Sequence, residues 1–379
     1  ARQRRDRPLV VALSGPQGCG KTTLCRELVA LLTAVDAGQA DTEQANRQAD
    51  TEQANRQADT EHAGEQPCWR QPLRAVTLSI DDFYLTHSEK CALAARNSDN
   101  PLLQYRGNAG THDIALGEST LQSLCSLGNS RNAEYGGEVL LPKYNKMLYN
   151  GQGDRVPVES GEWQRVTAPL DVVVLEGWMV GFTALGHEAV RSRFPSLCHE
   201  GKAVPSGLTA EHLAAIDDAL RDGMQARWYP FFDAIVHVDT VADSVGDFVY
   251  AWRLQQEQSA RAADAVVTVE GDNGGNSGDS GSNGGNGSNG DNGKSGGSGS
   301  GNSSDCSSVS GNDRGSSSGN DRGMSDAQVH DFVDRFMPAY ALYVPQMRAD
   351  MARRGDIPAM SIVLDAERDM VSVAVRNLK

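Results

Sequence analysis

Residues 15–22 read GPQGCGKT and fit the pattern G-x-x-x-x-G-K-[ST] of a phosphate-binding loop. Glycines let the backbone turn so that its N–H groups face a phosphate, which Lys21 can also reach. A chance match in a glycine-rich chain is the alternative, but a strand-like run precedes the loop and a helix-like run follows it. The residues expected to bind the nucleotide phosphates are Gly15, Pro16, Gln17, Gly18, Cys19, Gly20, Lys21, Thr22 and Thr23.

Two acidic residues follow other apolar runs of the chain. Asp81 comes just after residues 75–79, and Glu176 directly follows residues 171–175. Phosphoryl transfer to a hydroxyl needs a carboxylate near the attacking oxygen and a bound Mg²⁺. We expect Asp81 to accept the hydroxyl proton, and Thr22 and Glu176 to hold the metal. A helix cap at Asp81 or Asp82, and a strand-terminal cap at Glu176, are the alternatives.

Two polar, aromatic-rich segments lie between these acids, at residues 104–113 and 141–155. They carry Arg106, Lys146 and Arg155 in glycine-rich surroundings, where such cations can form a carboxylate or phosphate pocket. A solvated charged loop explains any one of them equally well. His112, taken alone, is more typical of a structural hydrogen-bonding residue.

The elements that must position these residues follow from the apolar pattern. Strands are expected at residues 9–13, 75–79, 171–175, 234–238 and 360–364, and helices at 23–32, 209–225 and 325–337. Alternating strands and helices predict an α/β fold with a parallel sheet of about five strands flanked by helices. Ligands collect at the carboxyl ends of such strands, where the phosphate loop, Asp81 and Glu176 should converge.

Two stretches carry no folding signal. A nonapeptide at residues 40–48 is repeated at 49–57 and begins again at 58–61, and residues 271–323 are almost entirely Gly, Ser, Asn and Asp. We therefore expect a single kinase-like domain over residues 1–379, interrupted by a low-complexity insertion at 36–67 and a disordered insertion at 265–322.

Composition excludes some classes of protein. The formal charge of −15 argues against a nucleic-acid-coating role, and no apolar stretch is long enough to cross a membrane. Seven cysteines without C-x-x-C pairs suit a reducing compartment. Because the chain starts at Ala1 without an initiator methionine, we expect a mature form that has lost any targeting peptide.

Six motifs in order along the chain resemble the plant-type D-glycerate 3-kinases. They lie at residues 15–23, 79–86, 105–113, 176–182, 252–255 and 323–340. The wider group comprises uridine kinase, phosphoribulokinase and pantothenate kinase. The segment PKYNK at 142–146 is similar to P-R-Y-N-K of photosynthetic members, but Lys143 replaces their Arg and Met147 their Ser. These departures weaken any substrate role for positions 143 and 147.

The resemblance implies a P-loop kinase fold with a lid, and ATP-dependent phosphorylation of D-glycerate to 3-phosphoglycerate, the closing step of photorespiration in chloroplasts. A cytoplasmic location is the alternative. Asp81 would be the general base, Glu176 a Mg²⁺ ligand, and Arg253 a lid residue that approaches the phosphates together with Lys21. The residues expected to bind the small-molecule substrate are Arg106, His112, Asp113, Tyr144, Lys146 and Arg155.

Three other functions are weighed against this one. Another small-molecule kinase of the uridine kinase or pantothenate kinase group would need a different acceptor pocket. A regulatory GTPase would need N-K-x-D, whereas residues 145–148 read NKML and lack the aspartate. A non-catalytic ATP-binding scaffold would release no ADP in response to D-glycerate.

Overall fold

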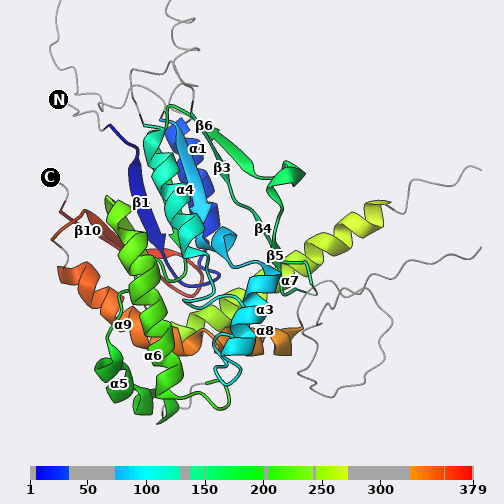
Figure 1. Cartoon of the computed structure of the whole chain (residues 1–379), viewed down its shortest axis with the longest axis vertical. Helices are drawn as coiled ribbons and strands as arrows, with labels where there is room; N and C mark the ends of the chain where they lie inside the picture. The colour runs from blue at the N-terminus through cyan, green and yellow to red at the C-terminus, as the bar shows by residue number, and fades with distance from the viewer. Residues whose placement is uncertain are drawn as a thin grey trace, which may run out of the picture. The chain divides into compact units, whose positions relative to one another are not determined.

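The computed structural model describes residues 6–33, 73–128, 137–149, 151–199, 204–241, 245–271, 325–353 and 355–377. Its centre is a six-stranded sheet in the order β10-β9-β8-β1-β7-β2 (Figure 1). The strands are β1 Leu9–Ser14, β2 Ala75–Ser79, β7 Val172–Gly177, β8 Ala234–Thr240, β9 Ala359–Leu364 and β10 Met370–Arg376. All neighbouring pairs are parallel except β9 and β10, which are antiparallel.

Helices and short helical turns connect these strands. The helices are α1 Lys21–Thr33, α3 His87–Arg96, α4 Ile114–Ser126, α5 His187–His199, α6 Ala210–Ala219, α7 Gly246–Gly271, α8 Asp326–Asp334 and α9 Met337–Arg353. The turns are η1 Ile80–Phe83, η2 Val158–Ser160, η3 Leu220–Gln225, which is a π-helix, and η4 Tyr229–Phe231. Two small antiparallel ribbons complete the described part, β3 Glu138–Leu141 with β6 Gln164–Thr167 and β4 Tyr144–Asn145 with β5 Asp154–Arg155.

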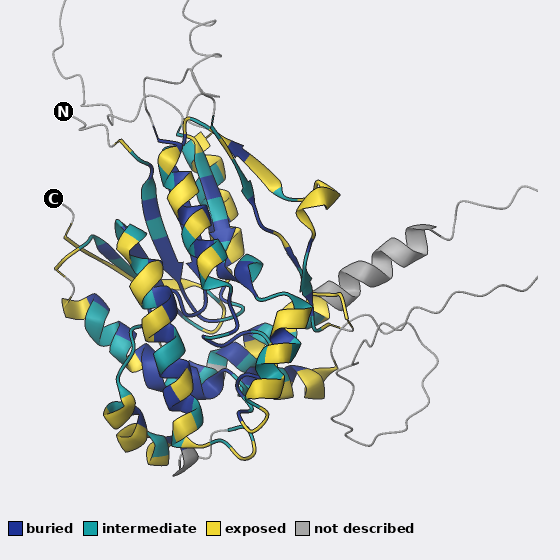
Figure 2. Ribbon diagram, viewed as in Figure 1, coloured by how far each residue is buried: buried dark blue, intermediate teal, exposed yellow. Residues whose placement is uncertain are grey.

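The central strands form because their residues are apolar and covered on both faces. Every residue of β7 is buried, whereas every residue of the edge strand β10 is exposed (Figure 2). On one face Cys25 of α1 packs against Leu13 and Val174, and Trp252 of α7 packs against Val238. On the other face α9 covers β8 and β9. Burial on both faces is the usual condition of a parallel sheet.

The predicted α/β fold is confirmed, with its five parallel strands in the expected places. The additional strand β10 was not predicted, because its alternating Val373 and Val375 pattern lies at an edge and buries no apolar face. The helix expected at 209–225 is present as α6 continued by η3. The one expected at 325–337 ends at Asp334, and a separate helix α9 begins at Met337.

The two predicted insertions lie almost wholly outside the described residues. The first, 36–67, is entirely outside them, and the second, 265–322, overlaps the described backbone only at 265–271, where α7 is still helical. In the part of the chain that the structure describes, no helix is long and apolar enough to span a membrane. In that part, Cys19, Cys25 and Cys125 are free thiols.

Candidate active site

The register of the sheet aligns the ends of three strands. Leu13 of β1 lies opposite Glu176 of β7, and Glu176 lies opposite Ser79 of β2. The phosphate loop starts two residues beyond Leu13, and Asp81 lies two residues beyond Ser79. Three segments that are far apart in the sequence therefore meet at the carboxyl ends of the strands, as the sequence predicted.

The phosphate loop has two residues in the left-handed region of backbone space, Gly18 with φ +80° and Gly20 with φ +89°. A Cβ on Gly18 would lie 2.6 Å from the Cβ of Trp252, so only glycine fits there. A Cβ on Gly20 would meet no atom within 4 Å. The loop is thus packed on one side and has open space beside Gly20, as a phosphate cradle needs.

Residues from the carboxyl-terminal part of the chain hold this loop in place. The backbone N–H of Gln17 donates to the Tyr340 hydroxyl at 2.9 Å, and Arg368 Nε donates to the Gly18 carbonyl at 2.8 Å. Arg368 also lies over the Trp252 ring, 5.3 Å from its centroid. The sequence analysis gave neither residue a role: Tyr340 only ends the motif at 323–340, and no pattern marks Arg368. Both contacts join residues more than 300 positions apart.

Lys21 and Thr22 are the first two residues of α1, and their side chains bond to the phosphate loop and to Glu176, respectively. Lys21 is buried, and its Nζ donates to the Pro16 carbonyl at 2.8 Å across the loop. The Thr22 hydroxyl donates to Glu176 Oε1 at 3.3 Å, and Glu176 is 7% exposed. Among the described residues no three His, Cys, Asp or Glu side chains cluster as a metal site. A hydroxyl beside a carboxylate fits Mg²⁺, which is bound in such loops by few protein oxygens together with phosphates and water.

Asp81 lies in η1 with both carboxylate oxygens engaged. Its Oδ1 accepts from the Tyr84 hydroxyl at 2.8 Å, and its Oδ2 accepts from Lys146 Nζ at 2.5 Å. Burial would raise the pKa of Asp81, but the Lys146 ammonium and the Tyr84 hydroxyl outweigh it and hold that pKa well below its usual range. The cap of η1 is Ser79, whose hydroxyl accepts from the Asp81 N–H at 3.3 Å. The Asp81 carboxylate is therefore not the cap of this turn.

The neighbouring carboxylate of Asp82 has a different environment. Its Oδ1 accepts from the backbone N–H of Tyr144 at 3.1 Å, which ties η1 to the β4–β5 hairpin. Burial raises the pKa of Asp82 to about 6, and the nearby Asp81 carboxylate adds to that shift. Two adjacent acids thus have pKa values shifted in opposite directions, a pattern typical of functional sites.

The predicted substrate-binding residues fall into two groups. Arg106, Tyr144 and Lys146 lie on or against the β4–β5 hairpin: Arg106 donates to the Gly151 and Gln152 carbonyls at 2.5 and 2.6 Å, and lies 5.9 Å from the Tyr144 ring centroid. The Tyr144 ring also meets Tyr84 edge-on at 5.4 Å. Within this group Lys146 pairs with the Asp81 carboxylate, and the Tyr144 ring contacts Tyr84, the other partner of that carboxylate.

The second group consists of Asp113, Arg155 and His112, whose contacts hold the first group in position. Asp113 caps α4 by accepting from Leu116 N–H at 3.0 Å, and it also accepts from Arg155 at 3.0 Å. Arg155 donates in addition to the Tyr84 carbonyl at 2.9 Å. The buried His112 ring lies 4.5 Å from the Tyr84 ring, and burial lowers its pKa to about 4 against the opposing Asp81 charge. These contacts favour structural support for Asp113, Arg155 and His112 over direct substrate contact.

Arg253 follows Trp252 on α7, which places it near the phosphate loop through the contact of Trp252 with Gly18. Its guanidinium lies over the Phe332 ring of α8, 5.2 Å from the centroid. The predicted lid residue is thus packed against an aromatic side chain in this structure.

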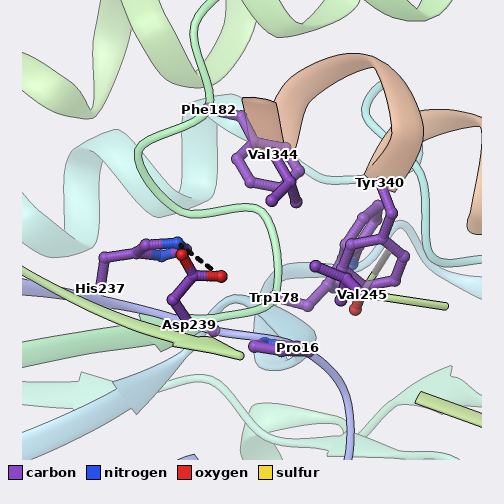
Figure 3. Close-up of a pocket in the computed structure, with 9 residues that line it drawn as sticks. Pro16, Trp178, Phe182, His237, Asp239, Val245, Tyr340 and Val344 are labelled. Carbon is purple, nitrogen blue, oxygen red and sulfur yellow. Dashed lines mark ion pairs between the residues drawn. The ribbon is translucent and has the colours of Figure 1, made fainter. Parts of the chain in front are cut away.

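A narrow pocket without room for a water molecule borders the start of the phosphate loop (Figure 3). It is lined by Gly15, Pro16, Trp178, Phe182, His237, Asp239, Val245, Tyr340 and Val344. Figure 3 shows His237 beside Asp239, with Nε2 4.0 Å from Oδ1. Asp239 also accepts from Arg348 of α9 at 2.8 Å. Because neither Asp81 nor Lys146 lines this pocket, it is distinct from the region around the predicted base.

Comparison with known proteins agrees with this geometry. No protein-family model matches the chain. It is 29% identical over 365 residues to the chloroplastic D-glycerate 3-kinase of Arabidopsis thaliana, covering 96% of this chain but only 54%, about half, of that relative. It is 31% identical over 260 residues to the uncharacterized kinase mug58 of Schizosaccharomyces pombe, covering 68% of this chain and 72% of mug58.

A solved structure shows the same fold. The D-glycerate 3-kinase of Cryptococcus neoformans superposes with a TM-score of 0.63 at 25% identity, over 99% of this chain and 92% of the fungal one. The glycine-rich loop and the mostly parallel sheet are features of a P-loop kinase. The similarity to these proteins extends over nearly the full length of the chain. The chain is therefore a P-loop kinase of the same family as mug58, and it is similar in sequence and fold to the D-glycerate 3-kinases.

Proposed function

We propose that this kinase transfers the γ-phosphoryl group of ATP to the 3-hydroxyl of D-glycerate, giving ADP and 3-phosphoglycerate. The observation that carries the proposal is the Asp81–Lys146 pair at 2.5 Å, beside the phosphate loop. It supplies a carboxylate for a hydroxyl and a cation for a small anion, the two groups of a hydroxy acid. Relatives that share the fold carry the name of this activity.

On the donor side, the loop N–H groups hold the phosphates of ATP, and Lys21 exchanges the Pro16 carbonyl for the β- and γ-phosphate oxygens. Thr22 and Glu176 would hold Mg²⁺, which when bound neutralises charge on those oxygens. Glu176 is nearly buried, so its position is set by the fully buried strand β7. This side therefore fixes the γ-phosphorus before an acceptor arrives.

On the acceptor side, the 3-hydroxyl oxygen attacks the γ-phosphorus while its proton passes to Asp81. A new O–P bond forms, the bond between the γ-phosphorus and the bridging oxygen breaks, and that oxygen leaves with ADP. The Tyr84 hydroxyl fixes the orientation of the Asp81 carboxylate during the step. Arg253, on the lid helix of the family, is placed to approach the transferring phosphoryl group if α7 closes.

We assign Arg106, Tyr144 and Lys146 to the acceptor pocket, with His112, Asp113 and Arg155 holding that pocket in shape. The support for this division is the pattern of contacts: the first three lie around the hairpin next to Asp81, whereas the others are buried or pair with one another. The half-exposed ammonium of Lys146 is available to a ligand, whereas Asp113 and Arg155 pair with each other.

Turnover of three acceptors tests the function against its nearest rivals. Purified protein is assayed for ATP-dependent ADP release with D-glycerate, uridine and ribulose 5-phosphate under identical conditions. We expect turnover with D-glycerate far above that with the other two. Preference for uridine or for the sugar phosphate would assign the chain to another branch of the superfamily, and no acceptor-dependent release would indicate a non-catalytic ATP-binding protein.

We further propose that the chain is one kinase domain with two insertions, 36–67 and 265–322. The Leu73 N–H donates to the Leu32 carbonyl at 2.9 Å, so the chain returns beside the point where it leaves α1. Tyr250 of α7 stacks on His330 of α8, with 5.0 Å between the ring centroids. The helices before and after the second insertion therefore also lie side by side. Deleting residues 36–67 should leave turnover intact, and loss of the folded state on deletion would contradict the proposal.

By its plant relative, we place the enzyme in the chloroplast, where its product would close the photorespiratory cycle. Import of the full precursor fused to a fluorescent protein tests this location. Signal confined to the cytoplasm would support the alternative.

A further inference from the structure

Both oxygens of the carboxylate proposed as general base already accept a hydrogen bond in this structure. Tyr84 occupies Oδ1 of Asp81 and Lys146 occupies Oδ2. A general base must lie within hydrogen-bond reach of the hydroxyl whose proton it takes. One of the two partners therefore has to leave Asp81, or share it, when the acceptor binds.

The two partners differ in their freedom to move. Tyr84 is 5% exposed, its ring lies on His112, and its backbone forms a bridge with His112. The Lys146 side chain is 51% exposed, and Lys146 directly follows the two-residue strand β4. The adjacent hairpin residues Met147 and Tyr149 are exposed by 66% and 54%. Lys146 is thus the partner that can withdraw.

Lys146 also differs from the other cations of the pocket. Arg106 donates to the backbone carbonyls of Gly151 and Gln152, and Arg155 donates to the Tyr84 carbonyl and to Asp113. Arg155 thereby holds the pocket together, whereas Arg106 is bound to the hairpin backbone. Lys146 instead pairs with the carboxylate of Asp81, so a second carboxylate can replace that partner one for one.

We propose that Lys146 is the specificity-determining residue of the reaction, because it covers Asp81 until the carboxylate of the acceptor draws it away. The inference rests on the proposed function and names how the acceptor is selected. A hydroxy acid opens the base by pairing its own carboxylate with Lys146. A polyol of the same size offers Lys146 no anion, and Asp81 stays covered.

The energetics of the exchange are favourable. An ion pair whose lysine is half exposed contributes little net stability, so its loss costs little. A new pair of the same type forms with the substrate, and the number of ammonium–carboxylate contacts is conserved. Departure of the Lys146 ammonium also removes the charge that lowers the pKa of Asp81, which makes this carboxylate a better proton acceptor.

The test compares kcat/KM for D-glycerate and for glycerol, which has the same two hydroxyls next to each other but no carboxylate. The variants are Lys146→Met and Lys146→Arg. Lys143→Met is the matched control, because Lys143 is also 51% exposed and lies three residues away, but pairs with Glu162 at 2.9 Å.

We expect the wild-type enzyme and Lys143→Met to prefer D-glycerate strongly. In Lys146→Met, kcat/KM for D-glycerate should fall and that for glycerol should hold or rise. The preference then shrinks by roughly 10- to 100-fold, the effect of one hydrogen bond to a charged group. Lys146→Arg keeps the cation and should keep most of the preference.

Other outcomes separate the inference from the function. An equal loss with both acceptors in Lys146→Met would overturn the inference, since Lys146 would then only support the site. An unchanged preference would overturn it as well. A wild-type enzyme that turns over neither acceptor would contradict the proposed function itself.

Discussion

The phosphate loop and the β4–β5 hairpin, which carries the proposed acceptor pocket, lie at the same end of one sheet but differ in how they are held. The loop uses backbone groups, and it is tied by Tyr340 and Arg368 from the end of the chain. Lys21 of the loop and Glu176 of the adjacent strand β7 are 9% and 7% exposed, although Thr22 is exposed. At the hairpin, the Lys146 and Asp81 side chains are 51% and 29% exposed.

This difference separates two tasks. Backbone N–H groups fixed by distant contacts bind any nucleotide phosphate in one geometry, and they do not distinguish acceptors. Exposed ion pairs can exchange partners at little cost, and they can respond to the charge of an acceptor. We infer that the loop side sets the phosphoryl donor in place and that the hairpin side selects what receives it.

The Asp81→Asn variant most clearly distinguishes the function of the hairpin side from that of the loop side. This change removes the proton acceptor but keeps the size of the side chain, so kcat should fall by about 10²- to 10⁴-fold. ATP affinity, measured by equilibrium binding, should stay at the wild-type level because the loop is untouched.

The matched control is Asp82→Asn, which retains an oxygen to accept from Tyr144 N–H. We expect only a small change in kcat. A large loss in Asp82→Asn with near-normal Asp81→Asn turnover would transfer the role of base to the neighbouring acid, whose pKa of about 6 lies closer to neutrality.

Lys21→Ala tests the donor side. Removing a cation aimed at the transferring oxygens should lower kcat by roughly 10²- to 10³-fold. In contrast to Asp81→Asn, this variant should also bind ATP more weakly, because Lys21 contacts the phosphates in the ground state. Normal ATP affinity and turnover in Lys21→Ala would contradict the assignment of residues 15–22 as the cradle.

The smallest expected effect is a change in the free energy of unfolding with pH. One buried histidine on each side contributes to it. Burial lowers the pKa of His112, next to the hairpin, and of His237, beside the loop, to about 4 from the ordinary 6.5. The unfolded chain then binds more protons than the folded one between these pH values. Each histidine contributes stability that is complete above pH 6.5 and is lost as the pH falls to about 4, by at most about 3 kcal/mol.

Asp82 acts in the opposite direction. Its pKa is raised to about 6, so its contribution declines as the pH rises from about 4 to 6. Urea unfolding of the wild-type protein and of His237→Gln at pH 7 and pH 4.5 measures the balance. The wild-type protein should lose more stability on acidification than the variant, and equal losses would show that His237 titrates normally.

Much of the donor side could be predicted from the sequence. The loop that carries Thr22 follows one apolar strand, and Glu176 lies near the end of another. Local pattern and the rule for strand ends were therefore enough to bring them together. The contacts of Tyr340 and Arg368 could not be predicted in the same way. They depend on how α9 and the β9–β10 turn pack, which no local spacing encodes.

The acceptor side was predicted as a set of residues and not as an arrangement. Lys146 and Arg155 looked alike in sequence, as cations in glycine-rich loops. In the structure Lys146 pairs with Asp81, whereas Arg155 holds Asp113 and the Tyr84 backbone. Partner choice depends on the β4–β5 register and the packing of Tyr84, which are tertiary features.

Identification of the phosphorylated product tests the central claim most directly. The wild-type enzyme is incubated with ATP, magnesium and D-glycerate, and the products are separated and identified by phosphorus NMR. The account predicts 3-phosphoglycerate and ADP in equal amounts. Phosphate on the 2-hydroxyl, or ADP formed with inorganic phosphate and no phosphorylated acceptor, would contradict it.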